Sequence, residues 1–140
     1  MSRLSIQKYK SMKINSAENA EPYELIQIVL SNIIGKLTAA RVFIDRKEIE
    51  QKGISISESI TLIGALQDSL DMDKGGEISI NLYRLYDFAQ AKLVEANFEN
   101  SKEKITEVMS IFSEIKSGWD AIPKDMRQTQ PVSEVQYAQE

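Results

Sequence analysis

The fold is decided by the segment at residues 69–88, which reads SLDMDKGGEISINLYRLYDF. An apolar helical pattern ends at Leu70, a charged turn with two adjacent glycines follows, and a new amphipathic pattern begins at Glu77. Glycine favours a turn at this point because it reaches positive φ without a steric penalty. Glu77 would then lie at the positive N-terminal end of the next helix. The segment therefore predicts two neighbouring helices joined by a short connection.

Apolar residues recur every three or four positions over four segments, at residues 22–44, 55–70, 77–98 and 105–122. This spacing indicates amphipathic helices. Pro22 suits the first position of a helix because its missing N–H has no partner there, and Pro123 would end the last helix. Four helices with short connections predict an all-α fold, an antiparallel up-down four-helix bundle.

The connections carry their own signals. The charged residues 45–53 end in Gly53, so we expect a helix end and a turn over this range. Asn100 is followed three residues later by Glu103, which matches the spacing of a capping box at the start of the fourth helix. Trp119 lies on the apolar stripe of that helix and is expected in the core.

A chain of 140 residues is one domain by length. We expect the bundle to occupy residues 21–123. Residues 1–20 are polar with scattered apolar side chains and are expected to form an N-terminal arm, with room for a short cap helix. Residues 124–140 are polar, contain Pro131, and are expected to form a flexible, disordered tail.

The composition excludes several classes of function. The chain has no cysteine and no histidine, so it lacks thiolate catalysis, disulfides, histidine-containing zinc sites and the commonest general base near neutral pH. The net charge of −4 argues against nucleic acid as a partner. No apolar run approaches the roughly 18 residues of a membrane span, so no membrane insertion is expected. We expect no enzyme activity, no catalytic residues, no bound metal and no cofactor.

One alternative reading of the glycine turn is a calcium loop, because Asp71 and Asp73 precede Gly76 at suitable spacing. The twelfth position of such a loop would be Leu82, where a bidentate glutamate is required. The turn is therefore better explained as a connection between helices.

The first segment is apolar over more than one narrow face, which exceeds the roughly three buried positions in seven that a bundle helix needs. Surplus apolar surface indicates a third packing layer, a dimer or a binding groove. Tyr83 and Tyr86 share one side of the third segment. They are either half-buried core tyrosines or an aromatic platform for a partner segment.

The segment at residues 69–88 also resembles the flagellin-specific export chaperones of the FliS family, in which S-L-D-x-(E/D)-K-G-G-E-I-A-x-N-L-x-x-L-Y-D-Y joins the second and third helices. Supporting matches are Tyr9-x4-Ile14 in the arm, Pro22-x-Glu24-Leu25-Ile26 at the first helix, Ala96-Asn97, Glu107-Val108 and Trp119-x-x-Ile122. The resemblance covers about residues 9–122.

The resemblance implies a cytoplasmic protein of the bacterial cytosol that binds the C-terminal segment of flagellin. It would prevent premature filament assembly and deliver the subunit to the flagellar type III export apparatus. Further partners would be the export gate and other flagellar regulators. With the surplus apolar surface, it suggests a flagellin-binding surface formed by Ile26, Val29, Ile33, Leu66, Leu82, Tyr83 and Tyr86. Tyr9 and Ile14 would act as a gating arm that covers part of this surface until the client displaces it.

This chain departs from the family pattern in the first helix. The family has T-A-S-P and M-L-Y-D-G where this chain has Asn19-Ala20-Glu21-Pro22 and Ile28-Val29-Leu30-Ser31-Asn32. Glu21 is a weaker N-cap than serine. The second change leaves open a family member with a diverged client. A self-associating structural or regulatory helical bundle is the other alternative.

Overall fold

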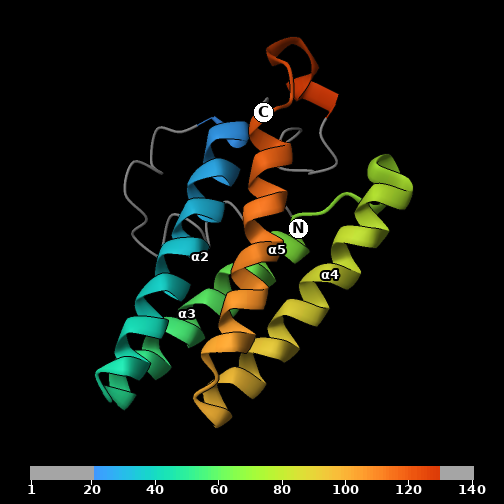
Figure 1. Ribbon diagram of the computed structural model, residues 1–140. Coiled ribbons are helices and arrows are strands. Elements are labelled where there is room, and N and C mark those ends of the chain that lie inside the picture. Colours follow the sequence, from blue (N-terminus) through green and yellow to red (C-terminus); the bar gives the residue numbers. More distant parts are fainter. Residues whose placement is uncertain (1–20, 130–140) are drawn as a thin grey trace.

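The computed structural model describes residues 21–129, which fold into an antiparallel four-helix bundle followed by a short 3₁₀ helix (Figure 1). The elements are α2 (Pro22–Asp45), α3 (Ile49–Asp68), α4 (Met72–Glu99), α5 (Lys102–Asp120) and η1 (Lys124–Thr129). Within this range there is no β-strand. Each helix packs on two others, since α2 and α4 each contact both α3 and α5. The predicted all-α bundle is confirmed.

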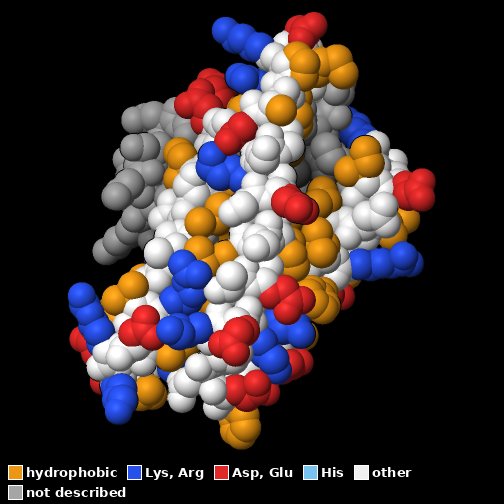
Figure 2. Space-filling view, in the orientation of Figure 1, with side chains coloured by type: hydrophobic (Ala, Val, Ile, Leu, Met, Phe, Trp, Pro, Cys, Tyr) orange, Lys and Arg blue, Asp and Glu red, His pale blue; other side chains and the backbone are white. Residues whose placement is uncertain are grey.

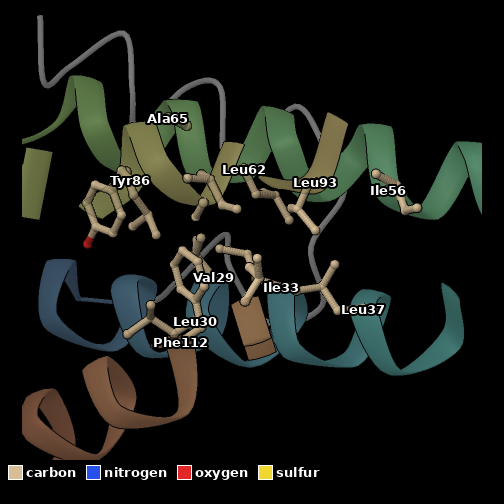
Figure 3. Packing of buried hydrophobic residues seen from close by; sticks show 14 of the residues in the cluster. Val29, Leu30, Ile33, Leu37, Ile56, Leu62, Ala65, Tyr86, Leu93 and Phe112 are labelled. Carbon is tan, nitrogen blue, oxygen red and sulfur yellow. The ribbon is translucent and has the colours of Figure 1, made fainter. Parts of the chain in front are cut away.

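The core lies along the bundle axis, where apolar stripes of all four helices meet (Figure 3). In Figure 3, Val29, Leu30, Ile33 and Leu37 of α2 point toward α3 and α4, and Phe112 of α5 packs beside them. The cluster has 20 buried residues. Full burial of one such side chain contributes roughly 1.5–3 kcal/mol. The surplus apolar face of α2 is therefore used mainly in contacts with its two neighbours.

By length and composition, α2 is also the one helix in residues 21–129 that could cross a membrane, with a mean hydropathy of 1.3 over its most apolar window. A helix that is buried in the core of a soluble bundle can be just as long and as apolar. Its apolar side chains belong to the buried cluster, and its neighbours are α3 and α5.

The helical backbone breaks at Gly76, within the predicted glycine turn, but α4 begins at Met72 and not at Glu77 as expected, so one turn of helix precedes the break. Gly76 interrupts α4 with φ 52° and ψ −127°, and the helix is regular beyond Glu77. Asp71 organises the turn, because its Oδ1 accepts hydrogen bonds from the amides of Asp73 (3.1 Å) and Lys74 (2.9 Å). Its carbonyl oxygen also accepts from the hydroxyl of buried Ser79 at 3.0 Å. Asp71 is thus an N-cap, which is the role that polar side chains have at helix starts.

Two details of the predicted connections are wrong. The second helix begins at Ile49 and not near Ser55, so Gly53 lies inside α3. The turn is made instead by Lys47, which takes φ 60°. The register of α3 explains the difference, because Lys52 is buried and Ile56 lies one turn further on the same side. The helical spacing of residues that face the core continues through Gly53, and this pattern could have predicted that the helix begins before Gly53.

The predicted capping box is also wrong. Asn100 is the left-handed C-cap of α4, with φ 53°, and Ser101 is the N-cap of α5. The Ser101 hydroxyl oxygen accepts from the Lys104 amide at 3.2 Å, which puts a lysine at the position where Glu103 was expected. Asparagine tolerates the left-handed region better than most residues, so it suits the end of a helix.

At the start of α2, Glu21 makes no side-chain cap hydrogen bond, and Pro22 occupies the first turn, as expected from the sequence. The chain remains ordered beyond Pro123, because η1 returns Arg127 to α2, where its guanidinium lies 4.0 Å from the Tyr23 ring centroid. The predicted arm and the predicted tail beyond residue 129 lie outside the described residues.

Candidate functional site

The apolar stripe of α4 changes from buried to exposed along its length. Ala89 and Leu93 are fully buried, whereas Leu82 and Leu85 are half-buried and Ile78 is 64% exposed. All five residues lie on the inward side of one helix by their spacing. The loss of burial therefore means that the neighbouring helices cover the N-terminal half of α4 less completely than its C-terminal half.

The facing side of α5 shows the same change. Lys104 and Glu107 pair with α4, and Ile111 and Ile115 follow on that side of α5 by helical spacing. Ile122 lies just beyond the end of the helix. These three isoleucines are half-buried, whereas Ile105 and Val108 nearer the start of α5 are fully buried. Because α4 and α5 run in opposite directions, the uncovered ends of both stripes lie at the same end of the bundle.

We call the resulting surface the open apolar face. Its residues are Ile78, Leu82 and Leu85 of α4, Ile111 and Ile115 of α5, and Ile122 just beyond the end of α5. In Figure 1, the N-terminal half of α4 diverges from the C-terminal half of α5 at this end. Figure 2 shows a strip of hydrophobic side chains between the two helices on the same face. An apolar surface of this kind can bind a partner by burying apolar side chains.

At the opposite end, α4 and α5 are held together by ion pairs. Lys104 Nζ lies 2.8 Å from Glu95 and 3.0 Å from Glu99, and Lys92 Nζ lies 3.9 Å from Glu107. The hydrogen bonds to Glu95 and Glu99 raise the pKa of Lys104, and the hydrogen bond from Lys104 lowers the pKa of Glu95. These pairs are solvent-exposed, so they fix the register of the two helices more than they add stability.

The structure places most of the predicted flagellin-binding residues in the core. Ile26, Val29, Ile33 and Leu66 belong to the buried cluster. Tyr86 is also buried and stacks on Phe112, with ring centroids 5.9 Å apart.

The other two predicted residues of this set reach the surface, because Leu82 is half-buried and Tyr83 is 43% exposed. Tyr83 and Tyr86 thus have different environments, although both come from one side of the helix. Tyr9 and Ile14, the predicted gating arm, lie outside the described residues.

Ile78, Leu85, Ile115 and Ile122 fall within the apolar spacing of the third and fourth predicted helical segments, and the sequence did not single them out for binding. The periodicity of an inward stripe is the same whether or not a neighbour covers it. No sequence signal distinguishes the two cases, since the coverage depends on the angle between α4 and α5.

Surface hollows elsewhere on the bundle are lined mainly by polar side chains, several of which pair with one another. The hollow between α2 and α5 contains the Lys102–Asp45 ion pair, at 2.6 Å, and the hydrogen bond from Arg41 to the Thr106 hydroxyl, at 3.0 Å. In residues 21–129 no three Asp or Glu side chains lie close enough together to hold a metal ion. The open apolar face is therefore the candidate site.

Comparison with known proteins identifies related sequences. The sequence profile of the family described as "Flagellar protein FliS" matches residues 5–126. The chain is 39% identical to flagellar secretion chaperone FliSB of Pseudomonas aeruginosa over 119 residues, which is 84% of this chain and 94% of the relative. It is 34% identical to flagellar secretion chaperone FliS of Salmonella typhimurium over 84% of this chain and 88% of the relative. It is 32% identical to the protein of the same name from Vibrio cholerae, over 88% and 91% of the two chains.

Proposed function

Because the chain belongs to the FliS family of flagellar proteins, we propose that it is a cytoplasmic export chaperone that binds the C-terminal segment of flagellin. It would prevent premature polymerisation and aid delivery to the flagellar type III export apparatus. The relatives at 32–39% identity are named flagellar secretion chaperones, a non-enzymatic role, and we propose no catalytic activity for this chain.

The observation that carries the proposal is the open apolar face. A chaperone for an aggregation-prone segment needs exposed apolar surface that does not collapse onto its own core. The divergence of α4 from α5 provides such a surface, and the buried cluster keeps the four helices together without it. The client would add its own apolar side chains between Ile78 of α4 and Ile115 of α5.

We propose that binding is coupled to folding of the client segment. Burial of apolar surface would drive the association, and the conformational entropy of the client would oppose it. The net affinity stays moderate in such a balance, so release at the export gate remains feasible. Other flagellar regulators could use the same or neighbouring surfaces.

We propose a graded role for the residues expected from the sequence. Leu82 and Tyr83 are accessible and would contact the client directly. Ile26, Val29, Ile33, Leu66 and Tyr86 would become accessible to the client only if the helices moved apart locally. Tyr9 and Ile14 would gate the surface by covering part of it in the free protein.

The proposal is tested by calorimetric titration of the full chain with a peptide of about the last 40 residues of the flagellin from the same organism. We expect one-to-one binding with a negative heat-capacity change. The variant Ile78→Asp should weaken binding by at least about tenfold, since one buried isoleucine is worth roughly 1.5–3 kcal/mol. The matched control is Ile54→Asp, at a residue of α3 that is 47% exposed and lies outside the open apolar face.

Equal loss of affinity in both variants would contradict the placement of the site at the open apolar face. No heat at any temperature, together with no co-elution, would contradict flagellin as the client. The gating role has its own test, because the double variant Tyr9→Ala and Ile14→Ala should then bind the peptide more tightly than the unmodified chain. Unchanged or weaker binding in that variant would refute the gate.

A further inference from the structure

Charged side chains follow the line along which α4 and α5 lie side by side. At the end opposite the open apolar face, Lys104 Nζ lies 2.8 Å from Glu95, and Lys92 Nζ lies 3.9 Å from Glu107. From Lys92 to Glu95 the chain of α4 advances by three positions, and from Glu107 to Lys104 the chain of α5 goes back by three. The two ion pairs therefore share one antiparallel register, which can be continued toward the open apolar face.

The next charged residues along this line are Arg84 of α4 and Glu114 of α5. Arg84 precedes Glu95 by eleven positions, about three helical turns, and Glu114 follows Glu107 by seven positions, about two turns. Each therefore projects from the same side of its helix as the paired residue. The shared register places Glu114 opposite residue 85, so Arg84 and Glu114 lie at one level on the two sides of the open apolar face.

Arg84 and Glu114 lack the contact that the other opposed charges make. Both residues are exposed, and neither makes an ion pair within residues 21–129. The Lys104 contacts are short and the Lys92 contact is longer, which agrees with the divergence of α4 from α5 toward this end (Figure 1). A cation on one side and an anion on the other therefore border the apolar side chains and are available to a partner.

We propose that Arg84 and Glu114 are specificity-determining residues, which fix the direction in which the client segment lies on the open apolar face. This inference rests on the proposed function. The client carries an apolar stripe, with an acidic side chain on the flank that meets Arg84 and a basic side chain on the flank that meets Glu114. Turning the client end for end, with its stripe still on the face, exchanges the flanks and brings like charges together. Like-charge contacts are disfavoured, so one direction is selected.

The apolar residues of the face cannot make this selection, because the hydrophobic effect is non-directional. Exposed charges at the edge of an interface add little affinity each, and their main effect is on specificity. Glu77 lies two turns before Arg84 on the same side of α4, at the level of residue 122, where α5 has already ended. Since α5 has no residue opposite Glu77, the opposed charges that can read both flanks of a client are Arg84 and Glu114.

Calorimetric titration of the full chain with the flagellin peptide of about 40 residues, at low ionic strength, tests the proposal. We expect Arg84→Glu and Glu114→Arg each to weaken binding about threefold or more, since attraction becomes repulsion. The double variant should bind more weakly than either, because both client contacts are then unfavourable. Arg46→Glu and Glu48→Arg are the matched controls, at exposed residues of the turn between α2 and α3, and should leave binding unchanged.

Variants of the peptide identify the charges that are read. Each acidic residue of the peptide is replaced by lysine in turn, and one replacement should restore binding to Arg84→Glu while weakening binding to the unmodified chain. In the same way, replacement of one basic residue by glutamate should restore binding to Glu114→Arg. These differences should diminish as the salt concentration rises, because salt screens exposed charges.

Three results overturn the proposal. A double variant that binds as tightly as the unmodified chain would show that Arg84 and Glu114 pair with each other and not with the client. Single variants that bind no more weakly than the controls would also refute it, while leaving flagellin as the client. No binding of the peptide to the unmodified chain would overturn this inference and the proposed function together.

Discussion

Tyr23 and Trp119 exchange hydrogen bonds across the bundle and stack their rings. The Tyr23 hydroxyl donates to the Trp119 carbonyl oxygen, and Trp119 Nε1 donates to the Tyr23 carbonyl oxygen at 3.1 Å. The ring centroids are 5.2 Å apart. This reciprocal contact joins the first turn of α2 to the last turn of α5, and it lets α5 stay fixed at the end where α4 diverges.

Removal of the tyrosine hydroxyl should therefore loosen this end of the bundle. We expect Tyr23→Phe to lower the free energy of unfolding by about 0.5–1.5 kcal/mol, the usual net value of one hydrogen bond. Urea denaturation followed by the fluorescence of the single tryptophan measures it. The control is Tyr83→Phe, because the Tyr83 hydroxyl makes no hydrogen bond within residues 21–129. Equal effects of the two variants would show that the contact adds no stability.

Lys52 is a buried lysine that stabilises the end of α4. Its Nζ donates to the Asn97 carbonyl oxygen at 2.8 Å, in the last turn of that helix, where carbonyls lack intrahelical partners. We expect Lys52→Met to cost about 1.5–3 kcal/mol, as for other hydrogen bonds to charged groups. The control is Lys36→Met, which removes only the exposed pair with Glu58 at 3.0 Å and should cost at most about 1 kcal/mol. A thermal denaturation series separates the two, and a smaller loss in Lys52→Met than in the control would contradict this role.

Substitution by alanine should destabilise the protein at Gly76 and stabilise it at Gly53. Gly76 has φ 52° and ψ −127°, which an alanine adopts at a cost of about 1–3 kcal/mol. Gly53 lies inside α3, where an added Cβ would meet no atom within 4 Å. Gly53→Ala should stabilise the protein by about 0.5–1 kcal/mol, because alanine is the better helix former. Paired measurements of the unfolding midpoint test both, and destabilisation by Gly53→Ala would contradict the helical assignment of residue 53.

Asp120 should make stability depend on acid pH. Hydrogen bonds from Lys116, and then from Gln27 of α2, hold the pKa of Asp120 below its ordinary value of 3.8. A carboxyl group with a lowered pKa in the folded state adds stability above its unfolded pKa and loses it as the pH falls through the folded pKa. We expect Asp120→Asn to be less stable by about 0.5 kcal/mol at pH 7, after allowance for solvent screening.

This difference should shrink as the pH falls below about 4 and vanish once the carboxyl group is protonated. Thermal denaturation of both forms across this range measures it. Asp125→Asn is the control, because the Asp125 side chain has no ion pair within residues 21–129. A difference between Asp120→Asn and the unmodified chain that is constant with pH would refute the explanation.

The sequence by itself determined the four helices, the glycine turn and the family. Apolar periodicity indicates which face of each helix points inward, and the glycine pair indicates where the helical backbone of α4 is interrupted, at Gly76. The sequence pattern for helix caps gave the wrong N-cap where two neighbouring polar residues could each fill that position. Asn100 and Ser101 illustrate this, since the choice between them depends on how α4 ends.

Only the tertiary structure decided which apolar residues remain accessible. Ile78 and Leu93 belong to one stripe, yet one is 64% exposed and the other is fully buried. Tyr83 and Tyr86 are three positions apart, yet only Tyr86 stacks in the core. Apolar periodicity indicates the side of its own helix from which a side chain projects. It does not indicate whether a neighbouring helix covers that side chain. Coverage depends on the angle at which α4 and α5 cross, which is a property of all four helices packed together.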